Sequence, residues 1–236
     1  YNGQVHDWDG YLTQDFSGGS GGAGVIMYNP DEDNAYWVHG QIYDEYKRAG
    51  GPSKLGAPKT RQESALASQD GTTGYYQRFS SGSTIQLVGS QAIVILPGIM
   101  RGFERAGYSG GGLGFPTGQE KEAAQSPISG WTGVYQPFEG GVIHWIRETD
   151  QVWVTGINQP GASQIHEKYK SLGGSGGDLG FPTSDDYLWQ EGVRQDFEAG
   201  HIWYTTGSGA QVVWTGSLSI SIIPQEAVDQ GAQWRI

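Results

Sequence analysis

The sequence predicts an all-β protein with short helices, built as an array of about four repeated β-hairpin units. Three observations lead to this prediction. A Gln-x-Phe triplet occurs four times with glycines at fixed spacing around it, two short apolar strands follow each triplet, and three copies end in a Leu-Gly-x-Pro tetrapeptide. Self-similarity at a period of this length is typical of proteins in which stacked units bury a continuous core.

The Gln-x-Phe triplet defines the register of the repeat. Its copies are Gln14–Phe16, Gln77–Phe79, Gln136–Phe138 and Gln195–Phe197. A glycine stands three residues after the Phe in every copy, at Gly19, Gly82, Gly141 and Gly200, and three residues before the Gln in the last three copies. Because both spacings agree, the copies are interpreted as one structural unit repeated along the chain.

Each triplet is followed by the pattern of a β-hairpin, in which two apolar strands flank a polar turn. The first strands are Val25–Tyr28, Thr84–Leu87, Val142–Trp145 and His201–Tyr204, and the second are Tyr36–Val38, Ala92–Leu96, Val152–Val154 and Val212–Trp214. Residues i and i+2 of a strand share a face. The expected core pairs are therefore Ile26 with Tyr28, Ile143 with Trp145 and Ile202 with Tyr204, while Met27, His144 and Trp203 point the other way.

Three copies continue into a short helix and a rigid corner. The apolar pairs Ile42/Tyr46, Ile99/Phe103 and Ile165/Tyr169 have i, i+4 spacing and are followed by Gly50, Gly107 and Gly173, which is typical of a helix that ends at a glycine. The corners are Leu55–Pro58, Leu113–Pro116 and Leu179–Pro182, with Leu113, Phe115, Leu179 and Phe181 expected to be buried. The fourth copy lacks both features and ends in a predicted strand, Ser217–Ile222, and the segment Pro224–Ile236.

These patterns predict a single array over residues 1–236, with approximate units 1–60, 61–118, 119–184 and 185–236. The formal charge of −11 opposes binding to phosphate backbones, so no nucleic-acid partner is expected. With no cysteine, disulfides and thiolate sites are excluded. No apolar run reaches the roughly 18 residues of a membrane span, and the first ten residues lack the pattern of a signal peptide.

Two segments carry a family resemblance, Leu179-Gly180-Phe181-Pro182-Thr183-Ser184-Asp185-Asp186 and the strand region Gln195–Tyr204. Together with Leu113–Thr117, they resemble the LGFP repeat family, and the resemblance extends over nearly the whole chain. It implies small β-units in an array, an extracellular or cell-wall-associated location and binding to cell-wall polymer. The match is weaker in the first two copies, where Ala57 replaces the Phe and Ser83–Gln86 replaces the Ile-x-aromatic strand.

Catalytic motifs are present only in contexts that favour structural roles. G-x-S-x-G strings occur at Gly18–Gly22, Gly107–Gly111 and Gly173–Gly177. A nucleophile elbow needs a strand before the Ser and a helix after it, whereas Ser109 and Ser175 follow a predicted helix and lead into the Leu-Gly-Phe-Pro corner. The histidines lack metal-ligand spacing, and Asp31–Asn34 is interpreted as a turn, so no metal and no cofactor is expected. Glu120 and Asp186 recur at the same distance from the corner proline, which favours a turn or a ligand contact over a unique catalytic pair.

The aromatic side chains are the candidate ligand-binding residues, because sugars present apolar C–H faces that suit flat rings. The predicted site consists of Trp37, Trp153, Trp189 and Trp203 with Asp185 and Asp186, and Trp37 and Trp153 are expected at equivalent strand positions. The predicted function is non-catalytic binding of a glycan or cell-wall polysaccharide by a multivalent, lectin-like repeat protein. The alternatives are a carboxylate-dependent glycan hydrolase and a structural or protein-interaction array. A binder should have two to four similar pockets, an enzyme one pocket with perturbed carboxylates. The oligomeric state is left open.

Overall fold

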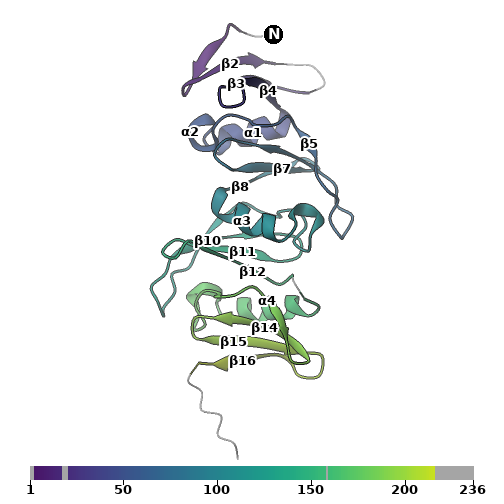
Figure 1. Cartoon of the computed structure of the whole chain (residues 1–236), viewed down its shortest axis with the longest axis vertical. Coiled ribbons are helices and arrows are strands. Elements are labelled where there is room, and N and C mark those ends of the chain that lie inside the picture. The colour runs from purple at the N-terminus through teal and green to yellow at the C-terminus, as the bar shows by residue number, and fades with distance from the viewer. Residues whose placement is uncertain (1–2, 18–20, 158, 216–236) are drawn as a thin grey trace, which may run out of the picture.

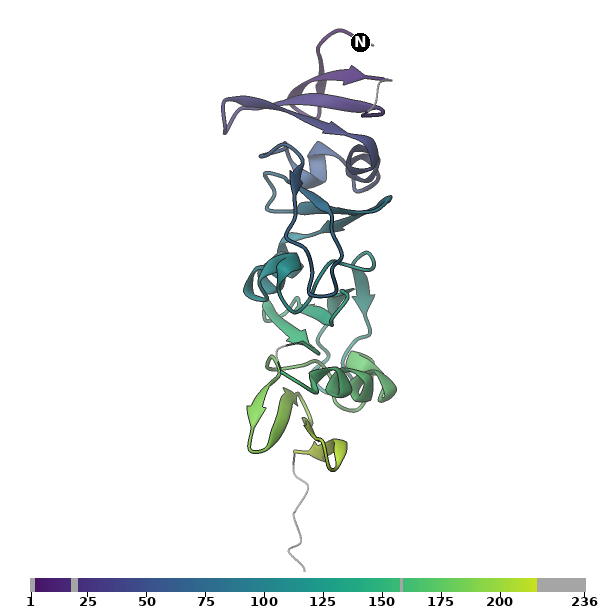
Figure 2. The same ribbon diagram turned by 90° about the vertical axis from the view of Figure 1, so that its right-hand side faces the viewer.

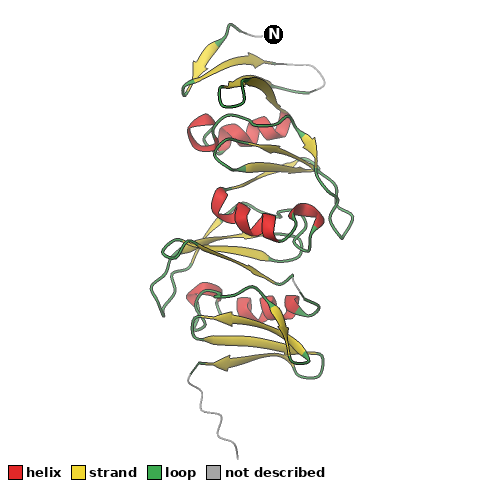
Figure 3. Cartoon of the chain, viewed as in Figure 1, coloured by secondary structure: helices red, strands yellow, loops and turns green. Residues whose placement is uncertain are grey.

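The computed structural model describes residues 3–17, 21–157 and 159–215. Over these residues the chain forms an elongated stack of four antiparallel four-stranded sheets, with helices between successive sheets (Figures 1 and 3). The sheets and helices still alternate along the long axis when the molecule is turned by a quarter (Figure 2). The structure confirms the predicted fold class, an all-β repeat with short helices.

Each sheet is formed by strands that are consecutive in the chain. The first contains β1 (His6–Trp8), β2 (Tyr11–Phe16), β3 (Gly24–Asn29) and β4 (Asn34–His39), and the second contains β5 (Glu63–Ser64), β6 (Tyr75–Arg78), β7 (Thr84–Val88) and β8 (Gln91–Ile95). The third contains β9 (Lys121–Ala123), β10 (Gly133–Pro137), β11 (Val142–Ile146) and β12 (Gln151–Thr155), and the fourth contains β13 (Tyr187–Trp189), β14 (Gly192–Phe197), β15 (Gly200–Thr205) and β16 (Gly209–Trp214). Each sheet lies within one of the four units that the sequence suggests.

The helices between the sheets bury one apolar face each. They are α1 (Gly40–Arg48) with the short α2 (Pro52–Leu55), α3 (Pro97–Arg105) with the 3-10 turn η1 (Tyr108–Gly110), and α4 (Ala162–Ser171) with the 3-10 turn η2 (Gly174–Gly176). The predicted i, i+4 pairs are all buried. The ring four residues on stacks against the triplet Phe of the next sheet, with centroids 4.9 Å apart for Tyr46 and Phe79 and 5.2 Å apart for Phe103 and Phe138. The helix of one unit thereby shares its core with the following sheet.

The Leu-Gly-x-Pro corners are structural, as predicted. Leu113, Phe115, Leu179 and Phe181 are at most 1% exposed. The ring of Phe181 lies against Gly133 of the preceding sheet, where an added Cβ would be 3.2 Å from the ring. Phe115 lies in the same way against Gly74, at 2.9 Å. These contacts explain why a glycine precedes the triplet at fixed spacing.

The triplet glutamine joins each sheet to the one before it. The Nε2 atoms of Gln77, Gln136 and Gln195 donate to the carbonyl oxygens of Trp37, Val94 and Val154, each in the last strand of the preceding sheet. Each also donates to the carbonyl two residues beyond the corner proline, in Thr60, Gly118 and Ser184. One side chain therefore fixes sheet, corner and neighbouring unit together.

The first sheet differs from the prediction. Val25 and Met27 are fully buried against α1, whereas Ile26 and Tyr28 are 37% and 36% exposed. Ile26 lies opposite Gln14 in the register, as Ile143 lies opposite Gln136. Ile26 is therefore on the face of the first sheet that corresponds to the Ile143 face of the third sheet. In the described part of the chain, however, no helix precedes this sheet, and the core forms on its other face. The prediction that Ile26 and Tyr28 are core residues is wrong for this reason.

Two other expectations concern the chain as a whole. No helix in the described ranges is long and apolar enough to cross a membrane. Gly19, the predicted strand Ser217–Ile222 and the segment Pro224–Ile236 lie outside the described residues.

Candidate functional site

The repeat places two equivalent cavities between a sheet and the helix that follows it. One, of about 330 Å³, lies between the second sheet and α3, and the other, of about 650 Å³, lies between the third sheet and α4. We call them the second-unit cavity and the third-unit cavity. The segments 65–74 and 124–132, which connect the first two strands of each sheet, extend on opposite sides of the stack toward the next unit (Figure 1).

The linings of the two cavities correspond position by position. Tyr76 and Tyr135 both precede the triplet Gln, Gln86 and His144 both lie opposite them in the register, and Ser109 and Ser175 both follow the helix. From the helices come Met100 and Phe103 in the second unit and His166 and Tyr169 in the third. Two similar pockets are what a binding array, but not a single-site enzyme, was expected to have.

The serines of the G-x-S-x-G strings hold the cavity walls. Ser109 Oγ donates to the Leu66 carbonyl and Ser175 Oγ to the Ala124 carbonyl, both at 2.7 Å. Both serines are buried and follow a helix. Each hydroxyl therefore ties a connecting segment to the 3-10 turn that follows the helix of the same unit. Ser20 of the first string lies outside the described residues.

The third-unit cavity contains two histidines. His144 is 6% exposed, and neither of its ring nitrogens has a hydrogen-bond partner in the described part of the chain. Burial, with a smaller contribution from the neighbouring His166, lowers the pKa of His144 to about 3. Burial also lowers the pKa of His166, and its Nδ1 has no hydrogen-bond partner among residues 3–17, 21–157 and 159–215. Both imidazoles are therefore neutral at pH 7.

A third cavity, of about 680 Å³, lies beside α3 and contains carboxylates. Trp145 Nε1 donates to Asp150 Oδ1 at 2.8 Å, and Arg101 binds the same carboxylate at 2.6 Å. Glu120 also lines this cavity, and burial raises the pKa of its carboxyl, although Arg147 opposes that shift. The cavity offers one ring and a carboxyl with a raised pKa.

The outer face of the fourth sheet brings Trp189 and Trp203 together. Trp203 lies opposite Arg194 in the register, and Arg194 lies opposite Tyr187, so the three share a face. The Arg194 guanidinium lies 4.9 Å from the ring centroid of Trp189, which packs edge-on to Tyr187. Asp196 accepts hydrogen bonds from Tyr187 Oη at 2.9 Å and Arg194 Nε at 2.8 Å. We call Tyr187, Trp189, Arg194, Asp196 and Trp203 the terminal aromatic face.

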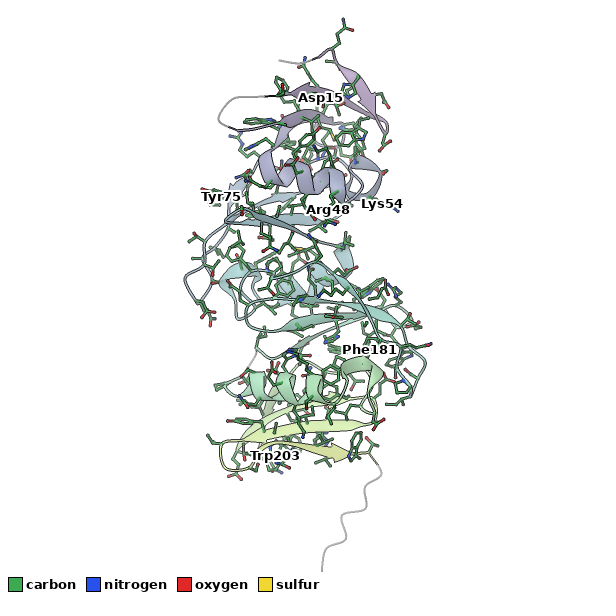
Figure 4. All side chains as sticks on the ribbon, turned by 180° about the vertical axis from the view of Figure 1, so that it is seen from behind. Asp15, Arg48, Lys54, Tyr75, Phe181 and Trp203 are labelled. Carbon is green, nitrogen blue, oxygen red and sulfur yellow. The ribbon has the colours of Figure 1, made fainter. Side chains whose placement is uncertain are left out.

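The terminal aromatic face corresponds to the cavity walls of the inner units. Arg194 occupies the position of Tyr76 and Tyr135, and Trp203 that of Gln86 and His144. No helix covers this face within the described residues, and the side chain of Trp189 is 43% exposed. Trp203 lies at the end of the stack opposite to Asp15 (Figure 4).

Trp37 and Trp153 lie elsewhere and are not equivalent. Trp37 is 42% exposed on the first sheet, stacked on His39 with ring centroids 3.9 Å apart. Trp37 lies opposite Ile26 in the first sheet, and Val154 lies opposite the equivalent residue, Ile143, in the third sheet. The counterpart of Trp37 is therefore Val154. Trp153 instead lies opposite His144 and is partly buried. The predicted equivalence is wrong because each Trp lies three residues before a glycine, Gly40 or Gly156, and the strand register puts these two glycines at positions that differ by one residue.

Asp185 and Asp186 lie at the joint between the third and fourth units. Asp185 receives Arg105 Nε and Nη2 at 3.0 and 2.9 Å and the Val154 amide at 2.7 Å. Asp186 is buried and accepts from the Gly156 amide at 3.3 Å. Neither belongs to the terminal aromatic face.

Sequence reasoning missed Tyr187 and Arg194. Two signals could have found them. Tyr187 is two residues before Trp189 in a strand, and Arg194 directly precedes the triplet Gln.

A chain in which the same joint recurs between successive sheet-and-helix units is a tandem repeat protein. Residues 113–177 and 179–220 match the LGFP repeat model. These two segments are LGFP repeats, and repeats of this family are in general cell-wall-associated. No curated protein matches the chain.

Proposed function

We propose that this protein binds cell-wall polysaccharide without turnover, through the terminal aromatic face and, at the other end of the stack, through Trp37. The observation that carries the proposal is the pair Trp189 and Trp203 on one sheet face, beside an arginine and a carboxylate. Trp189 is 43% exposed, a degree that core packing does not explain.

The chemistry of this face suits a sugar. A pyranose ring has apolar C–H faces and a rim of hydroxyl groups. Flat aromatic rings can cover the C–H faces, while the Arg194 donors and the Asp196 acceptors can bind the hydroxyl groups. Because Asp196 holds both Tyr187 and Arg194, little side-chain freedom is lost when a ligand binds.

The remaining predicted residues are assigned positioning roles. Asp185 and Asp186 bind backbone amides of the third sheet and so orient the fourth sheet. Trp153 lies in β12 of the same joint. Contacts at both ends of the stack would let one long polymer engage the protein twice, which raises affinity through effective concentration.

The hydrolase alternative rests on Glu120. A carboxyl with a raised pKa beside Trp145 and Asp150 has the composition of a glycosidase site. This activity would release reducing ends from the polysaccharide, whereas binding would not.

The test is a tryptophan-fluorescence titration of the full chain with soluble cell-wall polysaccharide. Trp189→Ala is expected to weaken binding about tenfold, or ~1.4 kcal/mol. Leu188→Ala is the matched control, because Leu188 is adjacent, exposed and on the opposite face of β13. Equal losses in both variants, or no binding by the wild type, would refute the proposal. Reducing ends that accumulate in wild type but not in Glu120→Gln would establish the hydrolase instead.

A further inference from the structure

The third-unit cavity has the size and the walls of a small-molecule site. Its volume of about 650 Å³ falls in the usual range for ligand pockets, roughly 300 to 1,000 Å³. The rings of Tyr135 and Tyr169 and the side chain of Val142 provide apolar walls. The cavity lies between β10 and β11 on one side and α4 on the other, so its walls belong to rigid elements.

Its polar groups are not explained by folding. His144 is 94% buried, and neither of its ring nitrogens has a hydrogen-bond partner among the described residues, which destabilises the fold relative to a satisfied polar group. The second-unit cavity has Gln86 and Met100 at the positions of His144 and His166, so the repeat scaffold does not require imidazoles there. A neutral imidazole offers one donor and one acceptor, the pair that a sugar hydroxyl satisfies.

The charges around the cavity are reversed relative to the second unit. Lys121 of β9 and Lys170 of α4 line it, and both are exposed. The register places Lys121 at the position of Glu63, and the helix pattern places Lys170 at that of Glu104. Two acidic residues of the second unit therefore correspond to two lysines of the third unit, in a chain of net charge −11.

The acidic groups near these lysines do not neutralise them fully. Glu122 also lines the cavity, but Arg147 holds its carboxylate at 2.6 Å. Glu167 lies 4.0 Å from Lys170 with both side chains mostly exposed, which makes a weak pair. The rim therefore carries positive charge that an anionic ligand can use.

We propose that the third-unit cavity binds one sugar residue that carries a carboxylate or a phosphate. Lys121 and Lys170 pair with the anionic group, and His144 and His166 bind hydroxyls of the ring. The proposal rests on the proposed function only in that the ligand is a saccharide, because the residues involved are distinct from those of the terminal aromatic face.

The experiment is an NMR titration of the full chain that follows the imidazole signals of His144 and His166. The probes are D-glucuronic acid and D-glucose 6-phosphate, with D-glucose as the neutral control, and His144→Gln and His166→Gln assign the signals. At least one acid is expected to shift both signals, at a concentration about tenfold lower than glucose requires. Binding of glucuronic acid alone identifies a carboxylate ligand, and binding of glucose 6-phosphate alone a phosphate ligand.

The variant Lys121→Gln/Lys170→Gln is expected to weaken binding of the acid about tenfold. Its control, Lys54→Gln/Lys59→Gln, makes the same change in net charge at exposed lysines of the first joint, and should bind within about twofold of wild type. Lys54 lies far from the third unit (Figure 4). An equal loss in the control, equal binding of glucose, or unmoved histidine signals would overturn the proposal. Trp189→Ala changes the terminal aromatic face and not this cavity. Loss of polysaccharide binding at the terminal aromatic face can therefore be distinguished from loss of acid binding in the third-unit cavity.

Discussion

The third and fourth sheets have the same strand order and the same hydrogen-bond register, but their outer faces differ in how far they are buried. In the third sheet α4 covers the face that carries Tyr135 and His144, and His144 is almost fully buried. In the fourth sheet the equivalent Arg194 and Trp203 are partly exposed, next to the more exposed Trp189. The strand pattern determines which side chains share a face, but the neighbouring unit determines whether that face becomes core, cavity or surface.

The comparison also separates rings that stabilise the fold from rings that are free to bind. Phe181 fills the joint between the two sheets, whereas Trp189 lies beyond it on the open face. The two rings lie close together in the sequence, so composition alone cannot distinguish them.

The largest effect is expected at this joint. Phe181→Ala removes a fully buried ring and should lower the free energy of unfolding by about 3 to 5 kcal/mol. Trp189→Ala, on the open face, should lower it by less than about 0.5 kcal/mol. Chemical denaturation of both variants measures the difference. Equal losses would mean that the two faces of the fourth sheet are buried alike.

Most of the fold could be predicted from the sequence because each joint uses the same few residues. The triplet glutamine, the helix pair and the corner are all visible as spacings, and the glutamine makes the same two hydrogen bonds at every joint. The first sheet was predicted wrongly at Ile26 and Tyr28 because alternation specifies a face, not its neighbour. Which side is covered depends on what precedes the sheet in space.

The candidate site was predictable only in part. Trp189 and Trp203 lie on one face, but this follows from the register between β13, β14 and β15, which sequence spacing does not give. Asp185 was expected to contact a ligand, and instead binds Arg105, 80 residues earlier in the chain. The cavities were missed because their walls combine a sheet, a helix and a connecting segment from different parts of a unit.

A smaller effect is expected on the pH dependence of stability, to which the third sheet should contribute more than the fourth. Burial lowers the pKa of His144 to about 3 in the folded state, so the unfolded chain binds more protons between that pH and the ordinary imidazole pKa of about 6.5. The contribution of neutral His144 to the free energy of unfolding should therefore be fully present above about pH 6.5. It should decrease as the pH falls, by about 2 kcal/mol between pH 7 and 5. In His144→Gln, which carries the residue of the second unit, this loss should be absent.

Denaturation of wild type and His144→Gln at both pH values measures the contribution of His144 together with its interaction with His166. The pKa of His201 in the fourth sheet is lowered by burial, but its side chain is only partly buried. His201→Gln should therefore remove less of the pH dependence. The same loss in wild type and His144→Gln would show that His144 is accessible to water.

The smallest effect concerns the ion pair that connects the two sheets. Arg105 and Asp185 bind each other through two hydrogen bonds, but their side chains are 46% and 30% exposed, so solvent screens the pair. A double-mutant cycle with Arg105→Ala and Asp185→Ala should give a coupling free energy of about 0.5 to 1 kcal/mol that falls as salt is added. At the preceding joint Gln119 accepts from the Val94 amide at 3.3 Å, as Asp185 does from Val154, but it is neutral. Gln119→Ala should cost stability independently of salt. A coupling free energy of zero for the Arg105–Asp185 pair would mean that Asp185 holds the fourth sheet through the Val154 amide alone, and that the charge at this joint does not contribute to its position.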